Sequence, residues 1–191
     1  MDFARHLKNG VVLGADTSLQ MLEYARQIVL EEGEVRWDFR DAGWGQRSLT
    51  GFGVPNAFLL RAGVKDLAAL CKPESFDVLV NVCVIEHFAN ASTPFPCDTQ
   101  EGIAAQLSLL KPGGMFVCAC TLAWRGGAAE WERWPTAESF VAYLEAEHGL
   151  AVEEWVEGVP NVEHVNARPG LVGSWPVLAL RAYKRVTPTP Q

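Results

Sequence analysis

The sequence predicts an α/β protein whose mostly parallel sheet ends in an antiparallel strand pair. Short apolar runs alternate with amphipathic helical patterns along most of the 191 residues, which is typical of a parallel sheet with helices on both faces. The run FDVLVNVCVI, at residues 76–85, is almost continuously apolar, as expected for a strand covered on both sides. Two final strand-like runs, joined by a long loop, predict the closing antiparallel pair.

The individual elements follow from periodicity and from residues that end helices. Met21, Leu22, Ala25, Ile28 and Val29 form one helical stripe, and a glycine at position 33 ends that helix. Residues 35–56 are rich in Gly and Trp and predict an inserted loop or a short strand pair. The expected strands are 11–15, 57–60, 76–85, 115–122, 151–156 and 176–183, and the expected helices are 18–32, 100–110 and 135–148.

Composition limits the class of protein. With 49% hydrophobic and 20% charged residues, the chain suits one soluble domain over residues 1–185 with a disordered tail at 186–191. The net charge of -7 argues against a broad nucleic-acid surface. No apolar run reaches the ~20 residues that span a bilayer, and the first ten residues lack a signal-peptide core. We therefore expect a cytoplasmic protein with no membrane and no nucleic-acid partner.

The five cysteines do not form a paired framework. Cys118 and Cys120 alternate on an expected strand without a second CxxC or a His pair, so no metal site is expected there. We expect them to be small buried hydrophobic residues in a reducing compartment.

Asp16 is the first candidate for a functional role. It ends the apolar run VVLGAD, and an acid at the carboxyl end of a parallel strand can accept hydrogen bonds from the hydroxyls of a ribose. The alternative is that Asp16, with Thr17 and Ser18, caps the next helix. The sequence leaves both interpretations open.

Three stretches, in this order, resemble the class I S-adenosylmethionine (SAM)-dependent methyltransferases. VVLGADTSLQMLEYAR resembles their second-strand motif, FDVLVNVCVIEHF their fourth strand and following turn, and LSLLKPGGMFVCACTL the helix, turn and fifth strand. Within the second stretch, VIEH resembles the ubiquinone-pathway O-methyltransferases. The resemblance implies a Rossmann-like sheet, SAM as cofactor, and a transferase acting on a small-molecule acceptor.

The resemblance also implies which residues hold the cofactor. Asp16 and Thr17 would lie on the ribose side. Asp66 would accept from the adenine amino group, with Leu67 near the ring. Asn81 and Val82 would lie close to the methionine part. A solvated loop aspartate is the alternative for Asp66, and Asp41 in RWDFRDAG is a rival for the adenine.

The turn after residue 82 carries the candidate catalytic residues. His87 could act as the general base, and Glu86 could orient it or bind a hard cation. In the metal-binding relatives a further acid stands three residues before that glutamate, where this chain has Cys83. Because a thiol is a poor Mg²⁺ ligand, no metal is expected. The alternative for His87 is a histidine at a helix start with no chemistry.

Two further stretches can be interpreted from their residue types, the KPGG turn and a tryptophan-rich segment. In KPGG, Pro112 stops a helix, and Gly113 and Gly114 allow the left-handed geometry of a sharp turn into the next strand, so a turn rather than a site is expected there. Trp124, Trp131 and Trp134 follow the fifth strand of the resemblance. They could form an apolar lid over the acceptor or belong to ordinary core packing.

The family's first strand and its glycine-rich loop, commonly [DE]xGxGxG, have no counterpart here, because MDFARHLKNG resembles the helix after that loop. We therefore expect this chain alone to bind SAM weakly or not at all. A truncated reading of an active enzyme, a catalytically inactive pseudo-methyltransferase that binds or regulates, and a half completed by a partner chain supplying the strand all fit. A nicotinamide-dependent oxidoreductase is disfavoured, because no GxGxxG follows a strand.

Overall fold

The computed structural model describes residues 10–17, 50–51, 57–82, 84–89, 95–121, 134, 136–158 and 177–186. The chain divides into two compact units. The first unit comprises residues 1–67 and 93–95, and the second comprises residues 68–92 and 96–191. The single domain expected over residues 1–185 stays a prediction.

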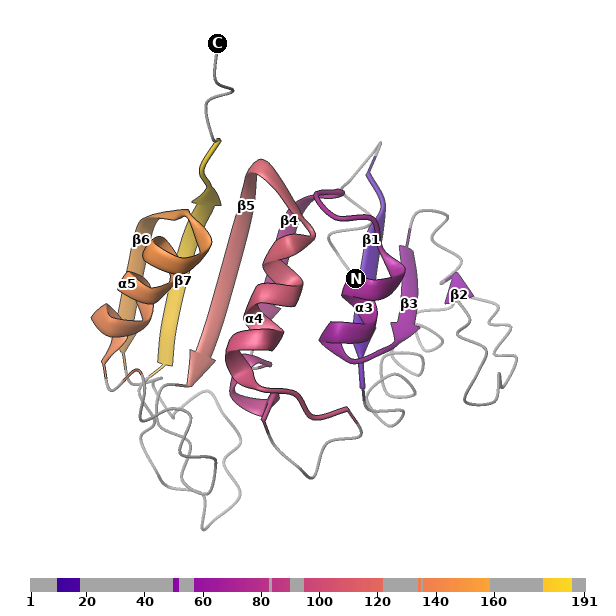
Figure 1. Ribbon diagram of the computed structural model, residues 1–191, viewed down its shortest axis with the longest axis horizontal. Helices are drawn as coiled ribbons and strands as arrows, with labels where there is room; N and C mark the ends of the chain where they lie inside the picture. The colour runs from indigo at the N-terminus through magenta and orange to yellow at the C-terminus, as the bar shows by residue number, and fades with distance from the viewer. Residues whose placement is uncertain are drawn as a thin grey trace, which may run out of the picture. The chain divides into compact units, whose positions relative to one another are not determined.

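The first unit is built on a small sheet with the strand order β1-β3-β2. Strand β1 (Val12–Asp16) runs parallel to β3 (Ala57–Arg61), and β2 (Thr50–Gly51) pairs antiparallel with β3 (Figure 1). The apolar runs at 11–15 and 57–60 therefore form neighbouring parallel strands, as expected, with bounds shifted by one residue.

The second unit contains a four-stranded sheet with the order β4-β5-β7-β6. Strands β4 and β5 are parallel, whereas β7 is antiparallel to both β5 and β6. The predicted antiparallel pair at the end of the chain is thus confirmed. The strands are β4 (Phe76–Val82), β5 (Leu110–Thr121), β6 (Leu150–Gly158) and β7 (Val177–Lys184).

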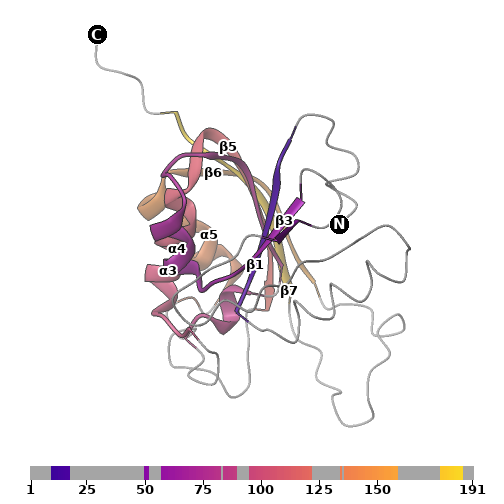
Figure 2. The same cartoon turned by 90° about the vertical axis from the view of Figure 1, so that its right-hand side faces the viewer.

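Two helices lie on one face of this second sheet, α4 (Thr99–Ser108) and α5 (Ala137–His148) (Figure 2). Helix α4 begins at Asp98, whose side chain accepts from Glu101 N at 3.0 Å. Helix α5 begins with a capping box between Thr136 and Ser139 and ends at Gly149 in the left-handed conformation. The helix expected at 18–32 lies outside the described residues, so the expected cover on both faces stays a prediction.

The core of the second unit lies between these helices and the sheet. Alternate residues of β5, among them Phe116, Cys118 and Cys120, are at most 1% exposed, because alternate strand residues share a face. The expectation that Cys118 and Cys120 are buried hydrophobic residues is confirmed. The other elements contribute Ile103 and Leu107 from α4, Phe140 and Leu144 from α5, and Leu178, Leu180 and Ala182 from β7.

The KPGG turn forms a bulge inside β5. Between the pairs Phe76–Leu110 and Val78–Met115, β4 advances by two residues while β5 advances by five. Gly113 has the expected positive φ of 78°. Gly114 does not, and space is its constraint instead, since an added Cβ would lie 2.9 Å from the backbone oxygen of Lys111. Of the two glycines that allow left-handed geometry, Gly113 therefore adopts it and Gly114 does not.

Candidate functional site

The carboxyl ends of β1 and β3 lie next to each other in the first unit. Asp16 is the last residue of β1 and pairs in register with Arg61. Its carbonyl accepts from Ala62 N at 3.1 Å, and Arg61 Nε donates to the carbonyl of Thr17 at 3.3 Å. These bonds fix the exit of β1 against the exit of β3, which places Asp16 at the strand end where α/β sheets bind ligands.

Asp66 lies in the first turn of a helix that the sequence analysis did not predict. Helix α3 (Val64–Leu70) follows β3 closely, and Leu67 N donates to Gly63 O at 2.9 Å. A Cβ added at Gly63 would lie 2.7 Å from Phe95 Cβ, so only glycine fits this turn. Asp66 lies in a helix rather than in a loop and is half-buried, and its role at the adenine stays a prediction. The structure thus brings Asp16 and Asp66 to the same edge of one sheet.

In the second unit, Asn81 is a buried polar residue near the carboxyl end of β4. It is 5% exposed, and its Nδ2 donates to Oε1 of Gln106 on α4 at 2.9 Å. Gln106 is 8% exposed. Within the described residues, Asn81 Oδ1 and Gln106 Nε2 find no hydrogen-bond partner. One acceptor and one donor are therefore held in the interior beside the predicted methionine position, whereas Val82, the next residue, is 56% exposed.

Glu86 and His87 lie in the short 3₁₀ helix η1 (Ile85–His87), and they meet different environments. Glu86 is 7% exposed, whereas His87 is half-buried. The turn is held by His87 N, which donates to Val84 O at 2.9 Å. Phe88 then packs on α4 at Gly102, where an added Cβ would lie only 2.4 Å from Phe88 Cδ2. Gly102 therefore allows η1 to lie close against α4.

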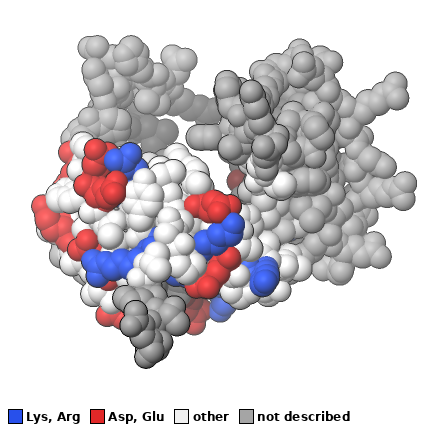
Figure 3. Space-filling view, turned by 90° about the horizontal axis from the view of Figure 1, so that it is seen from above, with Lys and Arg blue, Asp and Glu red and all other residues white. Residues whose placement is uncertain are grey.

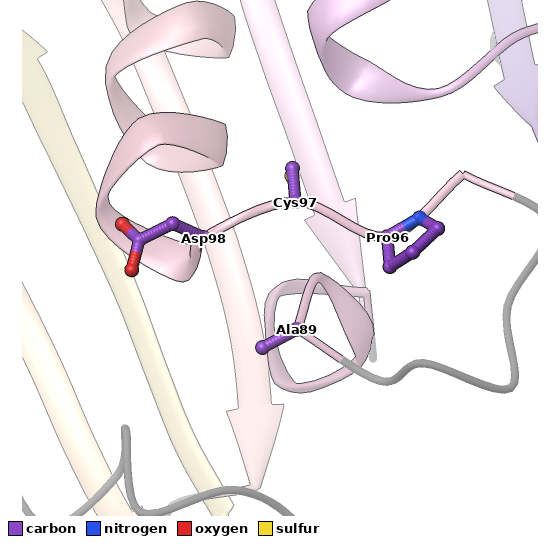
Figure 4. A pocket seen from close by; sticks show the side chains of 4 residues that line it. All are labelled: Ala89, Pro96, Cys97 and Asp98. Atoms are coloured by element: carbon purple, nitrogen blue, oxygen red, sulfur yellow. The ribbon is translucent and has the colours of Figure 1, made fainter.

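A shallow hollow of about 290 Å³ lies beside η1 and is lined by Ala89, Pro96, Cys97 and Asp98. Figure 4 shows these four side chains, with the Asp98 carboxylate at the start of α4. That carboxylate caps the helix, and Cys97 N donates to Phe88 O at 2.8 Å. No pattern in the sequence pointed to this hollow, because residues from two separate segments form it.

The position of Trp134 distinguishes between the two interpretations of this residue, an apolar lid and core packing. It is 4% exposed and packs edge-on against Phe140 and at a tilt against Tyr143, with ring centroids 5.3 and 4.7 Å apart. For Trp134 the core-packing interpretation is confirmed. Five further candidates lie outside the described residues, namely Ser18, Asp41, Cys83, Trp124 and Trp131.

No group of three or more His, Cys, Asp or Glu side chains is placed to hold a metal ion in the part of the chain that the structure describes. Among the described helices, none combines the length and the apolar character needed to cross a membrane.

Comparison with solved structures identifies the fold. The chain superposes on a SAM-dependent methyltransferase from Mesorhizobium loti with a TM-score of 0.51 and 19% identity, covering 91% of this chain and 80% of that one. For the 16S rRNA methyltransferase KamB the TM-score is 0.56 at 17% identity, with 97% and 81% covered. The chain has the methyltransferase fold.

The same fold also occurs in a protein described by a different reaction. The 4+2 cyclase SpnF gives a TM-score of 0.61 at 15% identity, over 97% of this chain and 71% of that one. No family model matches the sequence, and no curated protein matches it. The fold is therefore shown, and the reaction must be argued from the residues of the site.

Proposed function

We propose that this chain is a SAM-dependent methyltransferase that acts on a small-molecule acceptor. The observation that carries the proposal is Asp16 at the carboxyl end of β1, in register beside β3 and on the same sheet edge as Asp66, in a chain with the methyltransferase fold. A carboxylate at this place suits a ribose. The likeness of VIEH to ubiquinone-pathway O-methyltransferases is the finer part of the proposal.

The residues present fit the proposed cofactor. Asp16 and Thr17 would bind the ribose, while Asp66 would accept from the adenine amino group beside Leu67. Asn81 supports the methionine assignment, since its buried Oδ1 has no hydrogen-bond partner within the described residues and could accept from an amino group. An N-methyltransferase NodS with this fold, at a TM-score of 0.52 and 16% identity, is described in complex with S-adenosylhomocysteine (SAH).

The proposed methyl transfer needs two things from the protein, a general base and a site that excludes water. When bound, SAM supplies a methyl group on a positively charged sulfur. His87 would take the proton that the acceptor's hydroxyl loses. Its half-buried position lets it face both an acceptor and solvent. Glu86, buried next to it in η1, would orient the ring. No metal enters this proposal.

The charge distribution favours a small acceptor over a nucleic acid. On the described part of the face in Figure 3, Lys and Arg are interspersed with Asp and Glu and form no continuous basic patch. The net charge of -7 points the same way, because nucleic-acid affinity depends on clustered positive charge. Methyltransferases of rRNA with this fold exist, so the acceptor class is a proposal that filter-binding to RNA can test.

Calorimetric titration with SAM tests the cofactor assignment. We expect a chain extended by a strand ending in a GxGxG-type loop to bind SAM, because such glycines let the backbone approach the cofactor. If the 191-residue chain binds as tightly as the extended one, such a loop is not needed for the cofactor. If neither binds, the cofactor assignment is wrong.

The second candidate is a pseudo-methyltransferase that binds or regulates without catalysis. The likeness to SpnF, which is described as a cyclase, favours keeping it, since it shows that the fold serves more than methyl transfer. Binding of SAM without methyl transfer to any acceptor in a panel of hydroxylated small molecules would support this candidate.

A further inference from the structure

Two carboxamide side chains lie in the interior of the second unit, Asn81 on β4 and Gln106 on α4. They are 5% and 8% exposed, and Asn81 Nδ2 donates to Gln106 Oε1 at 2.9 Å. Their two other polar atoms, Asn81 Oδ1 and Gln106 Nε2, are buried and find no hydrogen-bond partner within the described residues. The pair therefore holds one acceptor and one donor in the interior.

Packing alone does not account for this pair. A buried polar atom without a partner costs free energy, whereas two apolar side chains of similar shape can replace a hydrogen-bonded pair at little cost. Ile103 and Leu107, on the same helix as Gln106, are apolar and at most 4% exposed, so apolar side chains fill the core next to it. A polar group that is buried in this way calls for a role beyond packing.

The place of Asn81 in the sheet suggests that role. It lies one residue before the carboxyl end of β4, which runs parallel to β5, and α/β sheets bind their ligands beyond this end of the strands. η1, which carries the proposed base His87, follows β4 closely. If His87 takes the proton of the methyl acceptor, the sulfur of SAM lies near η1. The amino-acid end of SAM, joined to the sulfur through two methylene groups, then lies near the end of β4.

We propose that Gln106 is a positioning residue of the cofactor site. It holds the carboxamide of Asn81 so that Oδ1 accepts from the ammonium group of the methionine part, and it does not itself touch the cofactor. This inference rests on the proposed function and deepens it, because it assigns to α4 a role in recognising the amino-acid end of SAM.

The bond to Gln106 decides which end of the Asn81 carboxamide is offered to a ligand. A carboxamide has an NH₂ group that donates and a carbonyl oxygen that accepts. Because Nδ2 donates to Gln106, Oδ1 is the atom that remains. An ammonium group can donate to this oxygen, whereas a carboxylate can only accept. The reverse orientation of the carboxamide would offer a donor and favour the carboxylate of the same amino-acid end.

Calorimetric titration with two ligands tests the inference, in the chain that binds SAM, with or without the GxGxG-type loop. The ligands are SAH and an analogue of SAH in which hydrogen replaces the amino group. We expect the parent chain to prefer SAH by about tenfold or more, because a hydrogen bond to a charged group is strong. Gln106→Leu should lower the affinity for SAH about three- to tenfold and leave the affinity for the analogue unchanged, since it frees Asn81 to turn away.

Two further variants serve as controls. Gln106→Glu keeps, in either protonation state, an oxygen that accepts from Asn81 Nδ2, and it should bind SAH like the parent chain. Gln100→Leu makes the same substitution at a half-buried position near the start of α4 and should change neither affinity. Far-UV circular dichroism checks that each variant is folded.

Three results would overturn the inference and leave the proposed function standing. The first is a parent chain that binds SAH and the analogue equally. The second is a folded Gln106→Leu variant that loses affinity for both ligands alike or for neither, and the third is a Gln106→Glu variant that binds SAH as weakly as Gln106→Leu. A parent chain that binds neither SAH nor methylthioadenosine, which has the nucleoside without the amino-acid end, would reject the cofactor assignment and this inference with it.

If Gln106→Leu does not fold, the side-chain amide signals of Asn81 in the parent chain decide. In nuclear magnetic resonance spectra these signals should shift on addition of SAH and stay unchanged on addition of the analogue. Equal shifts with the two ligands, or no shift with either, would contradict the inference.

Discussion

Strands β4 and β6 close the same sheet, yet they are built in different ways. β6 carries three glutamates, two of them near Arg181, and none of the candidate functional residues. β4 carries a buried amide, an exposed valine face and, at its carboxyl end, the turn with Glu86 and His87. The difference teaches that β6 has the composition of a solvated edge, while β4 has the composition of an interior strand and leads into the candidate site.

The largest effect is expected at the turn after β4. If His87 is the base, His87→Ala in the chain extended by the GxGxG-type loop should lower turnover by roughly 10²–10⁴ while leaving cofactor binding intact. Methyl transfer from labelled SAM and calorimetry with SAH measure the two quantities separately. His148→Ala is the matched control, because this histidine precedes β6 and has no proposed role in the reaction. A His87→Ala variant with the wild-type rate would remove His87 from catalysis.

The buried amide pair formed by Asn81 on β4 and Gln106 on α4 should show strong energetic coupling. Asn81→Leu alone leaves the polar atoms of Gln106 buried without their partner, which should cost about 1–3 kcal/mol of the free energy of unfolding. The double variant Asn81→Leu/Gln106→Leu should cost less than the sum of the two single variants, because no polar group is stranded. Urea unfolding of the four proteins measures this cycle. If the effects of the two single variants on the free energy of unfolding simply add up in the double variant, the 2.9 Å hydrogen bond contributes no coupling free energy.

His148, the last residue of α5, should give the free energy of unfolding a modest pH dependence. Burial lowers the pKa of His148 from its usual 6.5, partly opposed by Glu147, and its Nε2 lies 2.9 Å from the Tyr143 hydroxyl. The unfolded chain then binds the proton more readily, so stability should rise with pH from the lowered pKa up to 6.5 and level off above it. Urea unfolding across this range should lose that slope in His148→Gln. An unchanged slope would assign it to other groups.

The smallest effect is expected on β6 itself. Glu154→Gln removes a carboxylate 3.2 Å from Arg181, but both side chains are well exposed, so the free energy of unfolding should change by less than about 0.5 kcal/mol. A large loss of stability would mean that the edge of β6 is not a solvated surface.

Local signals in the sequence predicted the main elements. Helix α5 could be placed because Thr136 and Gly149 mark its ends, and β4 could be placed because its apolar run is uninterrupted. Helix α3 was missed because its seven residues are too few for a helical period to stand out. The KPGG turn was recognised, but its inclusion in β5 depends on hydrogen bonds that resume after the bulge.

The candidate site could be predicted only in part. Asp16 and Asp66 were found because acids that follow strands have a recognisable place in α/β sheets. Gln106 was missed, because its bond to Asn81 joins residues 25 positions apart and leaves no periodic trace in the sequence. The valine face of β4 was also read as buried. Its exposure depends on which elements pack over that face of the sheet, and these are set by tertiary packing.

The cofactor assignment at Asp16 is the central claim, and SAH titration of the extended chain with the GxGxG-type loop tests it most directly. Asp16→Ala should weaken binding by about 1.5–3 kcal/mol, the contribution expected of a hydrogen bond to a charged group. Asp77→Ala, which removes an exposed carboxylate paired with Lys111, should bind like the parent chain. Equal affinities for the parent and Asp16→Ala would contradict the account.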